Sequence, residues 1–293
     1  MALTINTNIS SIVAQKNLSN ATTSLNKAIE RMTTGYKINH AGDNAAGYSI
    51  ARNWETQLGS LDVAADNAAT GADMMSTLED HYSLIANHVQ RVRDLTEQAA
   101  NGTYGTDSLN AIKAEITARL SEIDRIAANC EFNGKHLMNG TDITSAVKLQ
   151  VGLYSGTDSQ ISLDSSLFSS AKVTGATGLF KTASGDATWI SVDAVATACT
   201  TGSPSASLDL LDKVIKEIST RTTTLGAAQN RIDSAIESIA VQSENITSSL
   251  STLRDADISK ESSKYIQAQI LQQAAATLLS TANQTPSIAL NLI

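Results

Sequence analysis

The stretch INTNISSIVAQKNLSNATTSLNKAIERM, residues 5–32, contains neither Gly nor Pro and decides the fold of the first part of the chain. Apolar side chains recur in it at steps that alternate between four and three residues: Ala14, Leu18, Ala21, Leu25, Ala28 and Met32. This spacing is the heptad seam of a coiled coil, in which one face of a helix packs along another helix. We expect the larger side chains, Leu18, Leu25 and Met32, to form the knobs of the seam.

The other end of the chain has a similar pattern. From about Ser259 onward, apolar residues recur at Ile266, Ile270, Ala274, Leu278 and Ala282. Two terminal seams of comparable length, with the rest of the chain between them, fold together most simply as an antiparallel pair. Ile266, Ile270 and Leu278 are therefore predicted to complete the self-assembly seam that Leu18, Leu25 and Met32 begin.

Further helical seams lie between the two ends. Gly35, Gly42 and Gly47 interrupt the first pattern and indicate a hinge. After it, apolar spacing predicts a long helix from Leu61 to Leu95, a third helix over residues 109–129, and another long helix from near Leu208 to Leu253.

The middle of the chain changes character. Residues 147–153, VKLQVGL, alternate apolar and polar side chains as a strand does, and the sequence around them is rich in Ser, Thr and Gly, with Phe180 and Trp189 as expected anchors. The predicted fold is mainly α, with antiparallel coiled-coil terminal helices, a helical bundle core and a small, partly β, solvent-exposed insert. Three domains are expected: 1–47 with 250–293, 48–140 with 205–249, and the insert, 141–204.

Composition excludes several functions. Aromatic residues make up only 4% of the chain, which suits thin helix seams better than a deep pocket. The net charge of −8 opposes binding to nucleic acid or to an anionic membrane, and no apolar run reaches the roughly 18 residues of a membrane span. The first residues do not form a secretory signal peptide, so the general secretion pathway is not expected to export the chain.

No catalytic, cofactor or metal motif is recognisable. His81 and His88 lie seven residues apart without further ligands, and no phosphate-binding loop or nucleophile triad is present. The acidic stretch DADISKE, Asp255 to Glu261, is interpreted as capping charge for the last helix. Cys130 and Cys199 are expected to be small buried side chains, although the sequence leaves a disulfide open. These observations predict a structural subunit without enzymatic activity or cofactor.

The terminal segments should need neighbouring copies to fold. Fixing about 70 residues costs on the order of 70–140 kcal/mol of backbone entropy, and one Ala- and Leu-rich seam buries little area to offset this. Apolar residues outside the seams remain for contacts between copies: Ile5, Ile9, Ile12, Val13, Ile29, Leu271, Leu279, Ile288, Leu290 and Leu292. We therefore expect these ends to be disordered in the monomer and to fold on assembly. The alternative is a pair of frayed helices that pack within one chain.

Several motifs, in series, resemble bacterial flagellin. They are ALTINTNISS (2–11), RMTTGYKINHAGDNAAG (31–47), VQRVRDLTEQAANGT (89–103), AEITARLSEIDRIA (114–127), FNGKHL (132–137), LGAAQNRI (225–232), RDADISKE (254–261), AQILQQA (268–274) and ANQTP (282–286). The resemblance covers nearly all of residues 1–140 and 205–293. The closest rival is a hook–filament junction protein, which shares the terminal segments, whereas the motifs at 90–102 and 225–232 favour flagellin. A signalling coiled coil would need a membrane span.

The resemblance implies a secreted filament subunit used in motility. The terminal segments would form the inner coiled-coil tube of the filament and the next segments its outer tube, while the insert would face solvent. Export would pass through the flagellum's own channel, so the chain would be extracellular without a cleaved signal peptide. Expected partners are other copies of the chain, an export chaperone, the filament cap and junction proteins. By the same resemblance, Gln90, Arg91, Leu95 and Glu115 would contact host Toll-like receptor 5.

Overall fold

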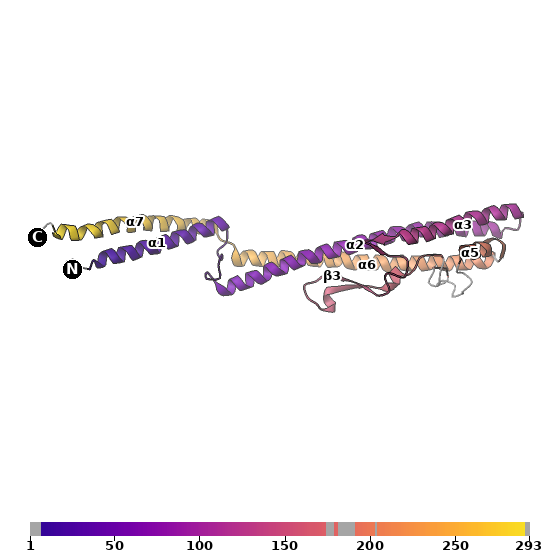
Figure 1. Cartoon of the computed structure of the whole chain (residues 1–293), viewed down its shortest axis with the longest axis horizontal. Coiled ribbons are helices and arrows are strands. Elements are labelled where there is room, and N and C mark those ends of the chain that lie inside the picture. The colour runs from indigo at the N-terminus through magenta and orange to yellow at the C-terminus, as the bar shows by residue number, and fades with distance from the viewer. Residues whose placement is uncertain (1–6, 174–178, 181–190, 203, 291–293) are drawn as a thin grey trace. The chain divides into compact units, whose positions relative to one another are not determined.

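The computed structural model describes residues 7–173, 179–180, 191–202 and 204–290, and it is mainly helical with small two-stranded sheets in the middle of the chain (Figure 1). This confirms the predicted fold class. The chain divides into two compact units: unit 1 is Met1–Leu58 with Ser243–Ile293, and unit 2 is Gly59–Gln242.

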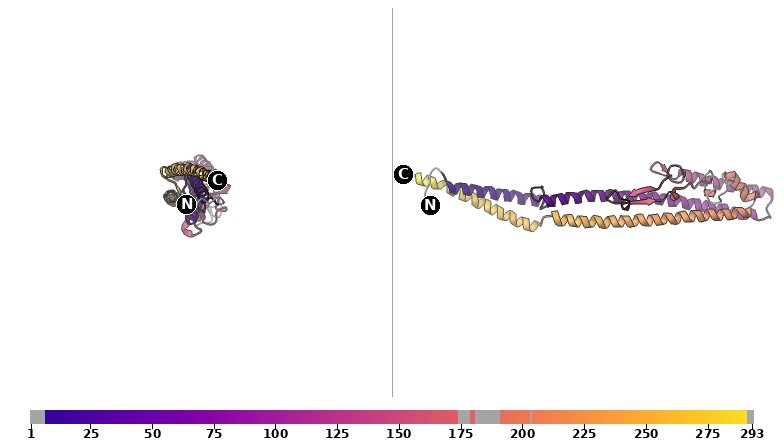
Figure 2. Two further views of the ribbon diagram at one scale, coloured as in Figure 1. Left: turned by 90° about the vertical axis from the view of Figure 1, so that its left-hand side faces the viewer. Right: turned by 90° about the horizontal axis from the view of Figure 1, so that it is seen from below.

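Unit 1 contains two antiparallel helices, α1 (Ile9–Thr34) and α7 (Ile258–Leu290), which lie side by side in both views (Figures 1 and 2). We call this pair the terminal hairpin. The Asn8 side chain caps α1 by accepting a hydrogen bond from the Ser11 amide at 3.0 Å, and Gly35 ends the helix in the left-handed region with φ 75°. Asp257 caps α7 by accepting from the Lys260 amide at 3.1 Å, which confirms the capping interpretation of this acidic stretch.

The chain segments that enter and leave the terminal hairpin are paired with each other. Residues 35–37 and 254–256 form a short antiparallel bridge, in which the Lys37 amide donates to the Arg254 carbonyl at 2.7 Å and the Ala256 amide to the Gly35 carbonyl at 2.8 Å. The Arg254 guanidinium lies over the ring of Tyr36 at 4.1 Å and forms an ion pair with Glu55. We call this bridge the joint.

Gly47 lies inside the first turn of α2 (Ala45–Ala100), so its assignment to the hinge that follows the first helix was wrong. Its role is close packing, because a Cβ at this position would approach the Ile38 side chain to 2.9 Å.

Unit 2 is built on α2, α3 (Thr106–Asn129) and α6 (Pro204–Arg254), of which α2 and α6 also contribute residues to unit 1. The predicted apolar seams are buried here. Their buried members include Leu61, Ala68, Met75, Leu78, Tyr82, Ile85, Val89, Val92 and Leu95 on α2, and Ile112, Ile116, Leu120, Ile123 and Ile126 on α3. Exposed ion pairs such as Arg93–Asp212 at 2.6 Å connect α2 to α6, which run antiparallel.

The insert consists of short elements. Strands β1 (Glu131–Phe132) and β2 (Lys135–His136) form a tight hairpin, and β3 (Val147–Gln150) pairs antiparallel with β4 (Gln160–Leu163). Two short 3-10 helices, η1 (Thr157–Ser159) and η2 (Ser165–Phe168), flank β4. A short helix, α5 (Val192–Thr197), continues into the π-helical turn η3 (Ala198–Gly202) before α6.

One side of the insert is exposed and the other is part of the core of unit 2. Tyr154 is exposed, whereas Leu167, Phe168, Val173 and Phe180 are almost fully buried with the apolar residues of the long helices. Phe180 is thus an anchor as predicted, while Trp189 lies outside the described residues. The sequence had not indicated that the insert supplies so much of the core.

Two side chains from the long helices hold the insert in place. The hydroxyl of Tyr82 on α2 donates to the Leu167 carbonyl at 3.1 Å, and the guanidinium of Arg221 on α6 donates to the carbonyls of Ser169 and Ser170 at 3.3 Å. Arg221 is only 6% exposed and is also paired with Glu217 at 2.9 Å. Burial raises the pKa of Tyr82, so its hydroxyl remains a donor.

Both cysteines are free and buried in unit 2, as expected. Burial raises the pKa of the Cys130 thiol to about 12 and also raises that of Cys199. Both therefore remain unreactive thiols in the folded unit.

Candidate assembly interface

The buried face of α1 is the face that the heptad spacing predicts. Ala14, Ala21 and Ala28 are buried, and half-buried Leu18, Leu25 and Met32 alternate with them. Because α7 is the helix that packs along α1, this face is the seam of the terminal hairpin. The small alanines let the two backbones approach closely, and the larger side chains fill the edges of the seam.

The seam face of α7 differs from the predicted one. Ile266, Ile270 and Leu278 are 52%, 60% and 62% exposed, whereas the buried positions are Glu261, Ala268 and Ala275, again seven residues apart. Half-buried Tyr265, Gln272 and Leu279 complete this heptad. The prediction that the three large aliphatic residues pair with α1 was therefore wrong for contacts within one chain. These residues project from the terminal hairpin and are available to other molecules.

The terminal hairpin exposes an unusual amount of aliphatic surface. In addition to those three residues, the described exposed side chains include Ile9, Ile12, Val13, Ile29, Ile258 and Leu271. Single exposed apolar side chains are normal, but many on one pair of helices indicate a surface that becomes covered.

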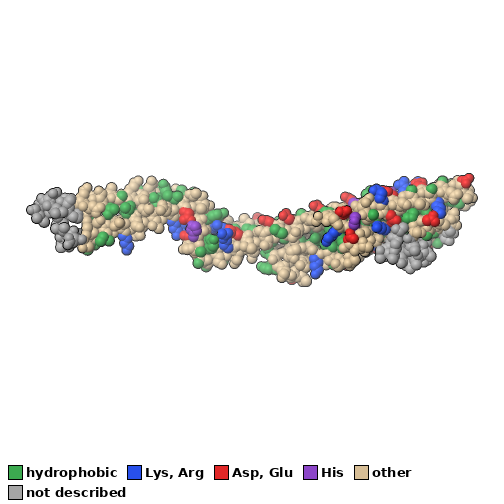
Figure 3. Space-filling view, viewed as in Figure 1, with side chains coloured by type: hydrophobic (Ala, Val, Ile, Leu, Met, Phe, Trp, Pro, Cys, Tyr) green, Lys and Arg blue, Asp and Glu red, His purple; other side chains and the backbone are tan. Residues whose placement is uncertain are grey.

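Charge is almost absent from the outer part of the same hairpin. Lys16 is the one charged residue in the stretches 7–26 and 265–290, and Figure 3 shows this part of the surface almost without blue or red. Unit 1 carries eight Lys and Arg against seven Asp and Glu, a net charge of +1, whereas unit 2 carries thirteen against twenty-two, a net charge of −9. Copies of the hairpin can therefore pack together with little electrostatic repulsion.

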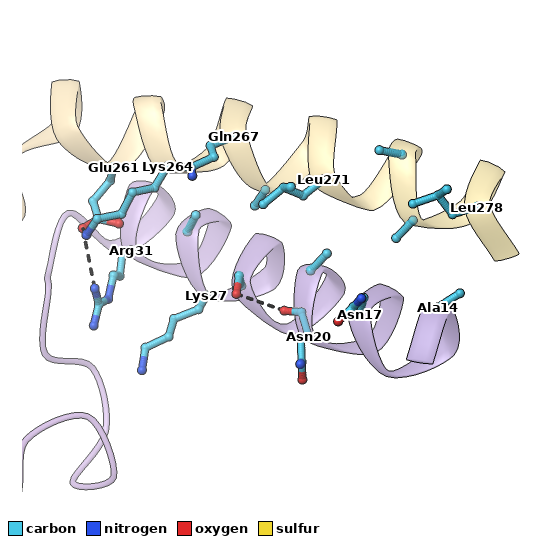
Figure 4. Close-up of a pocket in the computed structure, with 16 residues that line it drawn as sticks. Ala14, Asn17, Asn20, Lys27, Arg31, Glu261, Lys264, Gln267, Leu271 and Leu278 are labelled. Atoms are coloured by element: carbon cyan, nitrogen blue, oxygen red, sulfur yellow. Dashed lines mark hydrogen bonds and ion pairs between the residues drawn. The ribbon is translucent and has the colours of Figure 1, made fainter. Parts of the chain in front are cut away.

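A groove of about 640 Å³ runs along one side of the seam. Alanines such as Ala21 and Ala275 line it, Leu271 and Leu278 stand over one part, and charged side chains close the other end (Figure 4).

These charged side chains form an ion cluster at the base of the terminal hairpin. Glu261 is 5% exposed, and its carboxylate lies 2.6 Å from Lys264 Nζ and 3.5 Å from Arg31 Nη1. Asp43 lies 2.7 Å from Lys27 Nζ and 4.0 Å from Arg31 Nη2, and it accepts hydrogen bonds from the amides of residues 39 and 40. The hydrogen bond from Lys27 is the main reason that the pKa of Asp43 falls from 3.8 to about 2.

The four residues assigned to receptor contact lie in unit 2 on α2 and α3. Arg91 and Glu115 form an ion pair, with Arg91 Nε donating to Glu115 Oε1 at 3.1 Å, and Gln90 is exposed next to Arg91. Leu95 is 2% exposed and packs in the core. A partner that approaches this face reaches Gln90, Arg91 and Glu115, whereas Leu95 is not accessible to it.

No group of three or more His, Cys, Asp or Glu side chains among the described residues has a geometry that could hold a metal ion. None of the helices described is long and apolar enough to cross a membrane.

Comparison with known proteins identifies the family. Residues 5–142 match the bacterial flagellin N-terminal helical region, and residues 208–293 match the bacterial flagellin C-terminal helical region. The chain belongs to the bacterial flagellin family. Both helices of the terminal hairpin, α1 and α7, lie within the matched regions of this flagellin.

Full-length relatives agree with this assignment. Polar flagellin F of Vibrio parahaemolyticus serotype O3:K6 (strain RIMD 2210633) is 30% identical, with 100% of both chains covered. The flagellar filament 33 kDa core protein of Treponema phagedenis is 29% identical, with 99% of both chains covered. Among solved structures, one assigned as a flagellar hook-associated protein from Vibrio parahaemolyticus has a TM-score of 0.60 at 14% identity, covering 73% of this chain and 100% of that one. At this identity, the structural likeness concerns the fold alone.

This flagellin is a filament subunit for motility and a structural, non-enzymatic protein. The family assignment thus confirms the predicted function over the hook–filament junction alternative. A filament subunit polymerises with itself.

Proposed function

We propose that copies of this flagellin join through the outer aliphatic face of the terminal hairpin, which Ile266, Ile270 and Leu278 mark on α7. The observation that carries this proposal is the combination of exposed aliphatic side chains with an outer hairpin whose only charged residue is Lys16. Leu18, Leu25 and Met32 contribute from within each copy by holding α1 against α7. The predicted self-assembly seam thereby acquires two parts, one within the chain and one between chains.

The energetics favour this arrangement. Burying one aliphatic side chain contributes about 1.5–3 kcal/mol, and each copy offers several such side chains to its neighbours. Charged surfaces would add repulsion between identical molecules, and the outer hairpin has almost none.

A substitution on the outer face tests the interface. Ile270→Gln should raise the monomer concentration needed for polymerisation by about tenfold to a hundredfold, because it removes roughly 1.5–3 kcal/mol of burial per contact. Sedimentation of filaments at equilibrium measures this concentration. The matched control is Val241→Gln on α6, at a residue of similar exposure in unit 2. Equal effects of the two variants would contradict the proposal.

The domain roles follow from the same proposal. Residues 1–47 with 250–293 would form the inner coiled-coil tube, residues 48–140 with 205–249 the outer tube, and residues 141–204 the outward surface. The acidic character of unit 2 and the near-neutral character of unit 1 support this order, since charge is best tolerated where water remains. A cryo-electron microscopy map of the filament tests it, and an inward-facing insert would contradict it.

Location and helper proteins belong to the proposal as well. An assembled filament subunit is expected outside the cell, exported unfolded through the flagellum's channel, with an export chaperone, a filament cap and junction proteins as partners. The family membership supports this expectation. Affinity purification of the chain from cytoplasm and from sheared filaments tests it, because the chaperone should accompany the cytoplasmic form only.

Contact with Toll-like receptor 5 rests on resemblance together with an accessible surface at Gln90, Arg91 and Glu115. The Arg91–Glu115 pair presents both charges side by side on neighbouring helices. Arg91→Ala should weaken binding of the monomer to the receptor ectodomain in surface plasmon resonance, whereas Arg231→Ala, at an exposed arginine on α6, should not.

A further inference from the structure

The seam of the terminal hairpin repeats itself almost perfectly. Its described buried apolar residues are Ala14, Ala21 and Ala28 on α1, and Ala268 and Ala275 on α7, each seven residues from the next on its helix. A shift of α7 by one heptad, about 10.5 Å along the axis, would again place alanine against alanine. Apolar burial in this seam therefore gives little preference for one register over its neighbour.

Glu261 is the exception in this repeat. It occupies the heptad position of Ala268 and Ala275, is buried like them, and meets Arg31 of α1 and Lys264 of its own helix. After a shift of one heptad, Ala268 would face Arg31 and the Glu261 carboxylate would lose that partner. The buried carboxylate would keep Lys264 of its own helix but lose the cation that α1 supplies, which is unfavourable, so the shifted register is disfavoured.

We propose that Glu261, through its contact with Arg31, fixes the register of α1 against α7 and thereby determines which outer face the hairpin presents to other copies. This inference rests on the proposed role of the hairpin in assembly. A single buried polar residue in an otherwise apolar seam is a known way to specify register at some expense of stability. Glu261 is therefore a specificity-determining residue for polymerisation, beyond the helix-capping role assigned to its stretch of sequence.

The neighbouring contacts support this assignment. Arg31 also lies near Asp43, so the same guanidinium connects α1, α7 and the segment between α1 and α2. The joint fixes the chain only before the first turn of α7, through backbone hydrogen bonds of residues 35–37 with 254–256. Glu261 is the first seam residue of α7 beyond that point, where a change of register would have to begin.

Register can be measured with pairs of introduced cysteines. Gln272 Nε2 donates to Thr22 Oγ1 at 3.1 Å, so Thr22→Cys with Gln272→Cys reports the observed register. Thr22→Cys with Leu279→Cys reports the register shifted by one heptad. Each reporter chain is co-assembled with a large excess of the chain without introduced cysteines, so that the cross-links form within one molecule. The native Cys130 and Cys199 are buried and do not interfere. Mass spectrometry quantifies the cross-linked peptides after mild oxidation.

When Glu261 is present, we expect only the 22–272 cross-link to form. In the Glu261→Ala background, the yield of the 22–279 cross-link should rise at least tenfold. Glu261→Gln keeps a hydrogen-bonding partner for Arg31 and should behave as the native seam does, as should Lys260→Ala, a change at an exposed neighbour. If the Glu261→Ala chain is excluded from filaments while the Glu261→Gln and Lys260→Ala chains are incorporated, the proposal is also supported. An unchanged 22–272 cross-link with Glu261→Ala would overturn it. Absence of any 22–272 cross-link with the native seam would instead contradict the hairpin's role in the filament.

Discussion

Asp43 connects two parts of unit 1, α1 and the segment just before α2, with a single carboxylate. It accepts hydrogen bonds from the amides of Asn39 and His40 and forms a 2.7 Å ion pair with Lys27 on α1. A carboxylate with such partners is stabilised in its charged form, which is why its pKa is lowered to about 2. The residues just before α2 are therefore attached to the terminal hairpin by a contact that strong acid removes.

The pH dependence of this contact has a definite sign. Since the pKa of Asp43 in the folded chain is lower than 3.8, its contribution is fully present above pH 3.8 and is lost as the pH falls from 3.8 to about 2. Asp43→Asn should make filaments easier to dissociate at neutral pH, and the difference from wild type should shrink as the pH falls through about 2 and vanish below it. Sedimentation across this range measures the effect, and a difference that stays the same size well below the pKa of Asp43 would rule out this role.

At the scale of elements, Arg221 connects the long helices with the insert. Its guanidinium is nearly buried and donates to two carbonyls of the segment that follows η2. A buried guanidinium loses hydration, which counts against stability, but its removal leaves those carbonyls without a donor. The second effect should dominate, because Ser170 is buried and Ser169 is half-buried, so their carbonyls have little access to water as a replacement donor.

Arg221→Met tests this balance in the monomer. The free energy of unfolding should fall by about 2–4 kcal/mol, the cost of one or two unsatisfied buried carbonyls. Urea denaturation below the polymerisation concentration measures it, with Lys216→Met, at an exposed position of α6, as the control. A variant as stable as wild type would mean that the carbonyls find other donors.

Comparing α1 with α7 explains what the sequence could predict. On α1, Leu and Ala alternate at heptad spacing, so the face that packs along α7 was evident, and Leu18, Leu25 and Met32 are half-buried there. On α7, aliphatic residues occur on several faces, and the real seam includes the polar residues Glu261 and Gln272. Apolar spacing does not indicate such polar positions as part of a seam. Glu261 can be buried because Arg31 pairs with it, and Arg31 lies on a different helix, far away in the sequence.

The insert was difficult to predict for a related reason. Its Ser- and Thr-rich sequence is typical of an exposed loop, yet Leu167, Phe168 and Val173 are buried against the long helices. These apolar residues are too few, and too irregularly spaced along the sequence, to produce the periodic pattern of a helix or a strand. Their burial depends on tertiary contacts such as those of Tyr82 and Arg221, which no local pattern indicates. The long seams of α2, α3 and α6 were predictable because each repeats over several turns.

At the scale of the whole molecule, the two units differ in what their folding requires. Unit 2 buries large aliphatic and aromatic side chains from three helices and the insert in one core. In unit 1, the seam of the terminal hairpin buries mainly alanines and leaves its larger aliphatic residues outside. The apolar surface buried in such a two-helix seam offsets little of the conformational entropy that the terminal segments lose when they become ordered. Neighbouring copies must therefore supply the remaining apolar burial.

Amide hydrogen exchange, compared between monomer and filament, tests this claim most directly. We expect the amides of α1 and α7 to exchange freely in the monomer and to be strongly protected in the filament, while the core helices of unit 2 are protected in both states. Equal and strong protection of α1 and α7 in dilute monomer would show that the hairpin folds without its neighbours and would contradict the account.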